Sequence, residues 1–339
     1  MLGYRLAIVF SVAFLGVLAT TVYADEKPAA PLRVGIIGCD TSHVPSFAKS
    51  MREGKQKEIQ GLKLVAAYPG GSDDFPPSRD RVKKFTEELR EQGVQIVDSI
   101  DALMPLVDVV MIESVDGRVH LEQARQVFAA KKPVFIDKPV AVSLTDAIEI
   151  FRLAKEADVP CFSSSSLRYS PGLIELESKR KSNRVLGCDA YGPYKLAPPI
   201  PDMYWYGIHT VEMLYTVMGT GCKSVSRTSA DGADVVVGVW DDGRVGVYRG
   251  NAKGRPDFGV VVFGQKSITP IAATSNYENL LVEIAKFFRT GKPPVSEEVT
   301  IEICAFIEAA HESKRQNGAT IELADVMAKA REQIAKQAK

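Results

Sequence analysis

The chain has 339 residues, which is enough for two domains with full hydrophobic cores. Its 42 Lys and Arg residues balance 42 Asp and Glu residues, so the formal net charge at pH 7 is zero. This balance argues against a protein that binds nucleic acid, and it gives no reason to expect binding to an anionic membrane surface.

Residues 1–24 have the pattern of a Sec-type signal peptide. Arg5 precedes the apolar run 6–17, and a small residue, Ala24, stands at the expected cut. The run is short for a helix that spans a membrane, and retention as an N-terminal anchor is the alternative. We expect cleavage after Ala24, export to the periplasm or the medium, and a linker over residues 25–31.

Strand and helix patterns alternate through residues 32–165. The expected strands cover 32–38, 62–68, 95–97, 107–112, 134–136 and 159–163, and the expected helices cover 44–53, 79–92, 120–130 and a stretch that begins at 144. Alternation with short loops predicts right-handed βαβ units and a doubly wound parallel sheet.

The pattern changes after the serine run 163–166. Strand signals then predominate, at 235–240, 244–249 and 258–263, and helices are expected at about 204–218, 279–290 and 299–316. We predict a second α+β domain over residues 166–339, with a largely antiparallel sheet that carries helices on one face.

The fingerprint region at the end of the first strand has an unusual composition. Aligned on G-x-G-x-x-G, Gly38 fits the first glycine, while Asp40 and His43 take the second and third positions. A carboxylate at the second position adds bulk and an unfavourable charge near a pyrophosphate. The alternative is that Asp40, Thr41 and Ser42 cap the following helix, with His43 a first-turn residue that binds nothing.

A charged pair, Asp137 and Lys138, directly follows an apolar strand. Ligands of open parallel sheets bind outside the carboxyl ends of the strands. Pro139 restricts the backbone of Lys138 to extended geometry, so the ammonium leaves the strand in a restricted direction. A lysine held in this way can polarise a carbonyl group or transfer a proton. A solvated lysine in the loop is the alternative.

Together these segments resemble the glucose-fructose oxidoreductase, inositol dehydrogenase and MocA family (Gfo/Idh/MocA). Residues 137–139 resemble its Glu-Lys-Pro motif, residues 113–120 resemble the loop that leads to a similarly placed histidine, and residues 205–212 resemble its Asp-x-Gly-x-His segment. Residues 287–294 and 308–313 are similar to the last two helices of the family.

The resemblance implies an NAD(P)-binding Rossmann domain over residues 32–165, a sugar or polyol substrate, and a C-terminal sheet that forms homo-oligomers. It also implies that Lys138 orients the reacting hydroxyl and that His209 is the general acid/base, although His209 could instead be a core histidine. The cofactor-binding residues implied by the motifs are Gly38, Asp40, Thr41, Ser42, His43, Ser114, His120, Asp137 and Lys138.

Trp205 stands where the family has its catalytic aspartate. A tryptophan ring can pack on the apolar face of a sugar, and Asp202 or Glu212 could supply the missing carboxylate. Arg168, Tyr169 and Tyr206 are further candidates to face the substrate. The alternatives are core packing for Trp205 and Tyr206, and an ion pair with a carboxylate for Arg168.

The second strand ends at Tyr68 without an acidic residue at its tip to bind ribose hydroxyls, and Asp73 and Asp74 follow several residues later. Export in an unfolded state adds a difficulty, because an unfolded chain carries no bound dinucleotide. The leading prediction is nevertheless an exported NAD- or NADP-dependent oxidoreductase. An NAD-assisted glycoside-cleaving enzyme and a non-catalytic sugar-binding protein are the alternatives.

The five cysteines show no CxxC spacing and none lies beside a histidine, so the sequence predicts no metal site. An odd number in an exported protein leaves at least one thiol free. Cys39 and Cys161 lie in apolar strand-end contexts and are expected to be small buried hydrophobic residues.

Overall fold

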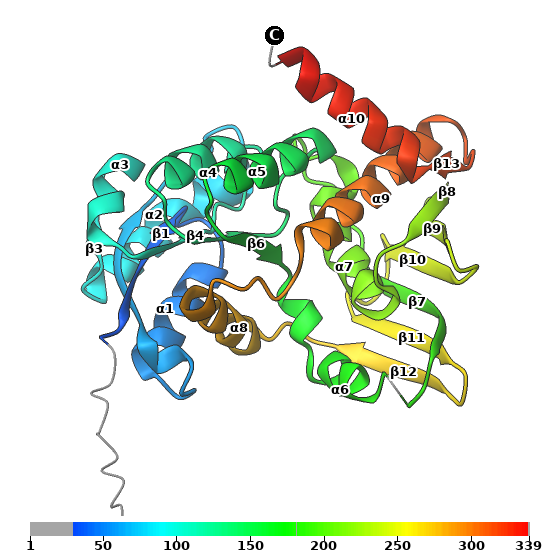
Figure 1. Ribbon diagram of the computed structural model, residues 1–339, viewed down its shortest axis with the longest axis horizontal. Coiled ribbons are helices and arrows are strands. Elements are labelled where there is room, and N and C mark those ends of the chain that lie inside the picture. The colour runs from blue at the N-terminus through cyan, green and yellow to red at the C-terminus, as the bar shows by residue number, and fades with distance from the viewer. Residues whose placement is uncertain (1–29, 181, 338–339) are drawn as a thin grey trace, which may run out of the picture. The chain divides into compact units, whose positions relative to one another are not determined.

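The computed structural model describes residues 30–180 and 182–337, so the expected signal peptide lies outside the described residues. Within these ranges, no helix has the length and apolar character needed to cross a membrane. Pro31–Lys339 groups as one compact unit that contains two sheets (Figure 1).

The first sheet has six parallel strands in the order β3-β2-β1-β4-β5-β6. The strands are β1 (Leu32–Ile37), β2 (Leu62–Tyr68), β3 (Gln95–Ile96), β4 (Val109–Ile112), β5 (Val134–Asp137) and β6 (Cys161–Ser164). All residues of β4, β5 and β6 are buried, as expected for strands covered on both faces. The strand order reverses between β1 and β4, which is the point where such sheets form their ligand crevice.

Helices cover both faces of this sheet (Figure 1). They are α1 (His43–Glu53), α2 (Pro76–Glu91), α3 (Ile100–Leu103), α4 (His120–Ala129) and α5 (Leu144–Glu156), with the 3₁₀ turns η1 (Ile59–Gly61) and η2 (Met104–Leu106). Side chains alternate along each strand, so Val110 and Ile112 share a core with α4 and α5, while Val109 and Met111 share the opposite core with α1.

The second sheet has seven strands in the order β12-β11-β7-β10-β9-β8-β13. They are β7 (Val185–Pro193), β8 (Cys222–Ala230), β9 (Ala233–Trp240), β10 (Val245–Asn251), β11 (Phe258–Gly264), β12 (Ile268–Ala273) and β13 (Ile321–Glu322). Only β7 and β10 pair in parallel, and the other neighbours are antiparallel. The predicted fold class is confirmed: a parallel α/β sheet is followed by a mixed, mostly antiparallel sheet with helices.

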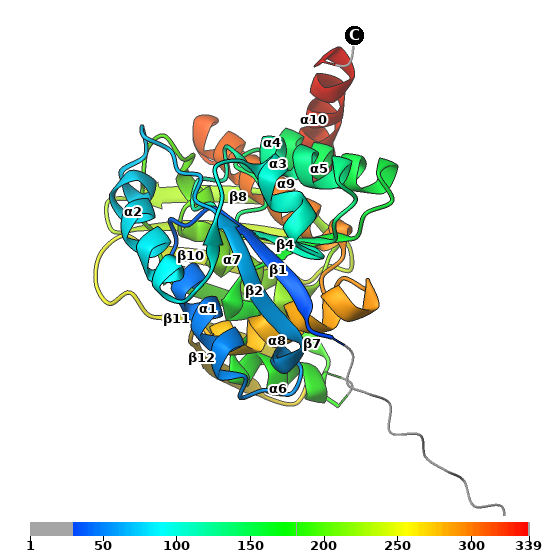
Figure 2. The same cartoon turned by 90° about the vertical axis from the view of Figure 1, so that its left-hand side faces the viewer.

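The helices of the second half are α6 (Pro171–Lys179), α7 (Gly207–Met218), α8 (Tyr277–Thr290), α9 (Glu297–Arg315) and α10 (Leu323–Gln337), with the 3₁₀ turns η3 (Ser166–Tyr169) and η4 (Asp202–Tyr204). Helices α7 and α9 pack against the second sheet. Helix α8 instead packs beside α1, where Leu280, Leu281 and Ile284 complete the core of the parallel sheet (Figure 2).

Candidate active site at the carboxyl edge of the parallel sheet

The loops that follow β1 and β4 are in direct contact at the point where the strand order reverses. Gly38 has a φ of +90°, and a Cβ atom at this position would lie 2.4 Å from the backbone nitrogen of Ser114. The Glu113 N–H donates to the Ile37 carbonyl at 2.7 Å, which extends the pairing of the two strands into their loops. Only glycine fits at position 38, for reasons of both conformation and space.

Asp40 ties these two loops together. Its side chain is fully buried, Oδ1 accepts a hydrogen bond from the Val115 N–H at 2.8 Å, and Oδ2 accepts one from Ser78 Oγ at 2.5 Å. Burial raises the pKa of Asp40, although both hydrogen bonds oppose this shift. Neither Asp40 nor Ser42 caps α1, because the Asp40 oxygens accept hydrogen bonds from Val115 and Ser78 and the side chain of the N-cap residue Ser42 makes no capping hydrogen bond. The backbone carbonyl of Thr41 accepts from the Val44 N–H at 3.3 Å.

A second connection joins the loops after β2 and β4. Arg118 makes hydrogen bonds to Asp74 at 2.8 Å and to Asp116 at 2.7 Å. Asp74 follows the end of β2 by several residues, too far along the chain for the ribose contact expected at the strand tip. It pairs instead with an arginine of the neighbouring loop.

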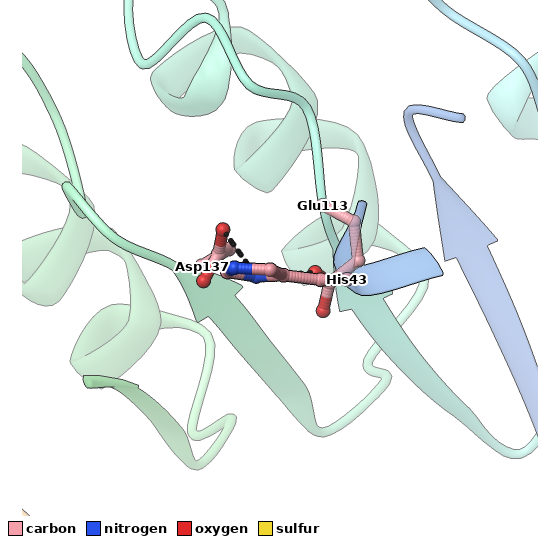
Figure 3. A group of neighbouring side chains, drawn as sticks. All are labelled: His43, Glu113 and Asp137. Carbon is pink, nitrogen blue, oxygen red and sulfur yellow. Dashed lines mark ion pairs between the residues drawn. The ribbon is translucent and has the colours of Figure 1, made fainter. Parts of the chain in front are cut away.

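His43, Glu113 and Asp137 converge at this edge from the start of α1 and the ends of β4 and β5 (Figure 3). His43 Nδ1 lies 3.0 Å from Asp137 Oδ2 and 3.7 Å from Glu113 Oε2, and the side chains are only 6%, 2% and 0% exposed, respectively. Burial lowers the pKa of His43, but the charge of Asp137 and the polar contacts with Asp137 and Glu113 together outweigh burial, and the pKa rises to about 9. Burial raises the pKa of Glu113 to about 8. The positive charges of His43 and Lys138 overcome burial and lower the pKa of Asp137.

His120 and Ser114 make hydrogen bonds that connect the loops at this edge of the sheet. The fully buried His120 ring places Nε2 2.7 Å from the Ser114 carbonyl and Nδ1 3.0 Å from the Pro139 carbonyl. Ser114 Oγ also receives a hydrogen bond from Gln123 Nε2 at 2.9 Å. These contacts hold the loop after β4 against the loop that carries Lys138.

Lys138 and His209, the two predicted catalytic residues, come from different halves of the chain and lie near enough for the Lys138 charge to affect the pKa of His209. Burial lowers the pKa of His209 well below its ordinary value, and the positive charges of Lys138 and His43 add to this shift. His209 is therefore a neutral imidazole at neutral pH. Its Nδ1 lies 2.7 Å from Ser165 Oγ, which leaves Nε2 as the nitrogen that can meet a substrate. Both Lys138 and His209 are partly exposed.

Two predicted substrate residues, Trp205 and Tyr206, are neighbouring, partly exposed aromatic side chains. The Trp205 ring packs edge-to-face on the buried Phe75 ring, with centroids 5.2 Å apart. The Tyr206 ring lies 6.2 Å from the His209 ring, and Lys195 Nζ lies over Tyr206 at 5.1 Å. Trp205 thus links the second half of the chain to the loop after β2.

The acidic candidates for the missing catalytic carboxylate are engaged in ion pairs. Asp202 lies 3.0 Å from Arg227 and accepts a hydrogen bond from Tyr194 at 2.6 Å. Glu212 accepts from Arg168 Nε at 2.9 Å, and also from Ser164 Oγ at 2.7 Å. The structure therefore gives Arg168 the ion pair that was its alternative interpretation.

Glu113 and Ser165 are site residues that the sequence did not single out. Glu113 immediately follows the apolar strand β4, just as Asp137 ends β5, so its position after the strand is the signal that could have indicated it. Ser165 lies in a run of serines, and nothing in the run itself distinguishes the one that contacts His209.

A dinucleotide bound to a Rossmann fold crosses the crevice between the loops after β1 and β4. Here Asp40 spans that crevice, Ser114 touches Gly38, and the buried ring of His43 fills the position of the third glycine. The residues present do not fit a dinucleotide in this conformation, because a pyrophosphate can enter only after Asp40 releases Val115 and Ser78.

A doubly wound parallel sheet with its strand reversal between β1 and β4, followed by a mixed sheet, is the architecture of two-domain Rossmann proteins. Residues 32–165 match the family described as "Oxidoreductase family, NAD-binding Rossmann fold" (GFO_IDH_MocA). Over this part of the chain, the match confirms the resemblance found in the motifs.

Solved structures of this class share the fold over most of the chain. An oxidoreductase from Agrobacterium radiobacter, solved with NAD+, L-tartaric acid and magnesium, has a TM-score of 0.69 at 17% identity and covers 87% of this chain and 99% of its own. Myo-inositol 2-dehydrogenase from Lactobacillus plantarum has a TM-score of 0.70 at 15% identity, with coverages of 86% and 99%. Scyllo-inositol dehydrogenase from Lactobacillus casei has a TM-score of 0.71 at 13% identity, with coverages of 87% and 99%.

Among curated proteins, YceM of Salmonella typhimurium, provisionally named as an oxidoreductase, is 24% identical over 202 residues. The alignment covers 58% of this chain and 60% of that protein. At these identities the likenesses to solved structures establish the fold alone.

Proposed function

We propose that this protein is an oxidoreductase that acts on a hydroxyl-bearing carbon of a sugar, a polyol or a sugar derivative. The observation that carries the proposal is that Lys138, at the carboxyl edge of the parallel sheet, lies near enough to a neutral His209 for its charge to affect the pKa of that histidine. The family match supports NAD or NADP as the oxidant, whose entry requires that Asp40 release its two hydrogen bonds.

In this proposal, a residue of this chain accepts the proton that the substrate hydroxyl loses. A neutral imidazole can accept a proton, and Ser165 fixes the ring through Nδ1 so that Nε2 is left to take the proton from a substrate hydroxyl. The ammonium of Lys138 stabilises the negative charge that develops on the same oxygen as the proton leaves. Each effect is of the order of ~100-fold or more in rate.

Two observations support a polyol as the substrate class. Tyr206 presents a partly exposed aromatic ring beside His209, and the partly exposed Trp205 ring lies next to Tyr206. Such rings pack on the apolar faces of sugars and cyclitols. Two structural neighbours are named as inositol dehydrogenases. The identity of the polyol and the choice between NAD and NADP are left to experiment.

A panel of inositols, hexoses and sugar acids, each incubated with NAD+ or NADP+ and the mature protein, tests the proposal. We expect reduction of the nicotinamide with at least one polyol, and a loss of at least ~100-fold in kcat/KM for His209→Gln. If no pair gives turnover while a polyol still raises the melting temperature, the proposal fails and a non-catalytic sugar-binding protein takes its place.

We also propose that the chain is exported and that the mature protein begins near Asp25, on the strength of the apolar run and the small residue before the cut. N-terminal sequencing of protein recovered outside the cytoplasm checks this. An intact N-terminus in a membrane fraction would contradict it.

A further inference from the structure

We propose that His43, Glu113 and Asp137 bind a divalent transition-metal ion, with Zn²⁺ and Mn²⁺ as the candidates. This inference goes beyond the proposed oxidoreductase activity and does not depend on it. It also departs from the expectation drawn from the cysteines, because the ligands come from a histidine and two carboxylates that are far apart in the sequence.

The geometry of the three side chains is that of a ligand set (Figure 3). One ligand atom from each residue lies within 4.8 Å of the other two, and the two distances from His43 Nδ1 are 3.0 Å and 3.7 Å. Metal–ligand bonds of ~2.0–2.2 Å in a tetrahedron separate neighbouring ligand atoms by about 3.4 Å. The two separations from His43 Nδ1 are therefore within about 0.4 Å of tetrahedral spacing, and the third is no more than 4.8 Å.

Most polar atoms of the cluster lack hydrogen bonds. Among the described residues, both Glu113 oxygens and Asp137 Oδ1 are buried without a hydrogen-bond partner, and His43 Nδ1 has only its ion pair with Asp137 Oδ2. Glu113 is the clearest example of an unpartnered buried group, because its side chain is 0% exposed and directed into the cluster. Buried polar atoms without partners are rare and costly, so each such group requires an explanation. A metal ion gives all of them a partner at once.

The charge of the cluster also suits a divalent ion. Two buried carboxylates carry a formal charge of −2 when ionised, and a divalent cation neutralises it. One imidazole nitrogen combined with carboxylate oxygens is a donor set that suits Zn²⁺ and Mn²⁺, whereas Mg²⁺ and Ca²⁺ prefer all-oxygen sites. The competing explanation is a protonated His43 that pairs with Asp137 and leaves Glu113 uncharged.

The ion would act by positioning rather than by contact with the substrate. The Tyr277 ring covers His43, with ring centroids 4.6 Å apart, and the three ligands are buried. The ion would join α1 to the ends of β4 and β5, and its ligand Asp137 directly precedes Lys138. A bound metal would therefore hold the strand end that presents the catalytic lysine.

Metal analysis of the wild-type protein, purified without chelator, tests the inference first. We expect about one equivalent of Zn²⁺ or Mn²⁺ per chain. After the ion is removed by chelation, we expect re-addition of the correct ion to raise the melting temperature by roughly 3–6 °C at a concentration 100-fold above its dissociation constant, and Mg²⁺ or Ca²⁺ to have a smaller effect.

Variants then locate the ion. Glu113→Gln should abolish the metal-dependent shift, while Glu308→Gln, a matched change of a half-buried glutamate on α9 outside the cluster, should retain it. Wild-type protein that carries no metal and shows no shift with either ion would overturn the inference, and so would an equal shift in Glu113→Gln. Because both readouts are independent of turnover, failure here is distinct from failure of the proposed oxidoreductase function. If Glu113→Gln does not fold, the wild-type result alone decides.

Discussion

Asp40 shows how a single side chain can limit which ligands bind at the carboxyl edge of a Rossmann sheet. In a dinucleotide complex the second fingerprint position lets the backbone approach a pyrophosphate. Here the Asp40 carboxylate accepts hydrogen bonds from the Val115 N–H and the Ser78 hydroxyl. An acidic side chain of the protein therefore uses the donors that an anionic ligand could otherwise bind. Its contacts explain how a carboxylate is tolerated in this buried position.

Lys138→Met tests the catalytic role of the lysine. The change removes the ammonium but keeps most of the side-chain stem, so we expect kcat/KM for the polyol to fall by at least ~100-fold while the melting temperature changes little. Turnover and melting should be measured on the same preparations, with Lys155→Met, an exposed lysine of α5, as the control. Unchanged turnover would return Lys138 to the role of a solvated loop residue.

Gly38 and Gly93 provide a matched pair for the contact between the loops after β1 and β4. Both have positive φ, +90° and +81°, but a Cβ at Gly38 meets the Ser114 backbone at 2.4 Å whereas a Cβ at Gly93 meets nothing within 4 Å. Replacement by alanine costs roughly 1–2 kcal/mol at either position through backbone strain. The clash should add at least about 1 kcal/mol for Gly38→Ala.

Chemical denaturation of both alanine variants measures this difference in unfolding free energy. Equal losses would show that the loop after β4 can move away from Gly38 at no cost, and the crevice would then be open to a dinucleotide.

At the scale of single elements, α9 and η4 are joined by a buried histidine. His311 on α9 is 8% exposed, and its Nε2 accepts a hydrogen bond from the Met203 N–H of η4 at 3.3 Å. Burial lowers the pKa of His311 to about 4. The folded protein therefore keeps this imidazole neutral in a pH range where the unfolded chain protonates it.

The pH dependence follows from this lowered pKa. Above the ordinary pKa of about 6.5 the two states bind no proton at this site, and below it the unfolded state binds one first, so stability falls as the pH drops from about 6.5 to about 4. The contribution of His311 to this loss reaches roughly 3 kcal/mol. Unfolding free energies of the wild type and of His311→Gln, compared at neutral pH and near pH ~4.5, isolate it. Parallel pH profiles for the two proteins would contradict the assignment.

The elements of the parallel sheet could be predicted from sequence because each carries a local signal. Apolar runs such as Val109–Ile112 mark strands that are buried on both faces, and the predicted bounds differ from the observed ones by a few residues at most. Strand β7, Val185–Pro193, was not predicted, because its sequence mixes glycine, aspartate and proline with apolar residues. It is a strand because β10 and β11 supply its hydrogen bonds from distant parts of the chain.

For the site too, local sequence motifs predicted some residues, whereas contacts between distant segments could not be predicted. Lys138 and His209 could be proposed from motifs that are local in sequence. The partners of these residues could not, because contacts such as those of Ser165 with His209 and Asp40 with Val115 depend on how separate loops pack. The packing of α8 against α1 likewise depends on tertiary contacts, which strand and helix patterns do not predict.

At the scale of the whole molecule, one face of the second sheet carries no helix from the described residues. Val239 and Val245 are neighbours across β9 and β10 on this face and are 40% and 44% exposed, while α7 and α9 pack against the opposite face. Val237 and Val247 pair beside them. Apolar surface of this kind is typical of a contact between protein chains, which supports the expected homo-oligomer.

Val245→Lys should shift the mature protein toward the monomer, because a lysine at the centre of the face cannot be buried against a second copy without loss of its hydration. Light scattering coupled to size-exclusion chromatography measures the mass. Leu196→Lys, a change of a 61% exposed residue that lies outside the strands, is the control. A monomeric wild type would contradict the expectation.

The most direct test of the account as a whole is a calorimetric titration of NAD and NADP into the mature wild-type protein and the Asp40→Gly variant. The carboxylate closes the crevice between β1 and β4, so we expect weak binding by the wild type and at least several-fold tighter binding by the variant, which corresponds to about 1 kcal/mol or more. Weaker or equal binding by Asp40→Gly would show that the Asp40 contacts help to hold the cofactor, and it would contradict the conclusion that they exclude it.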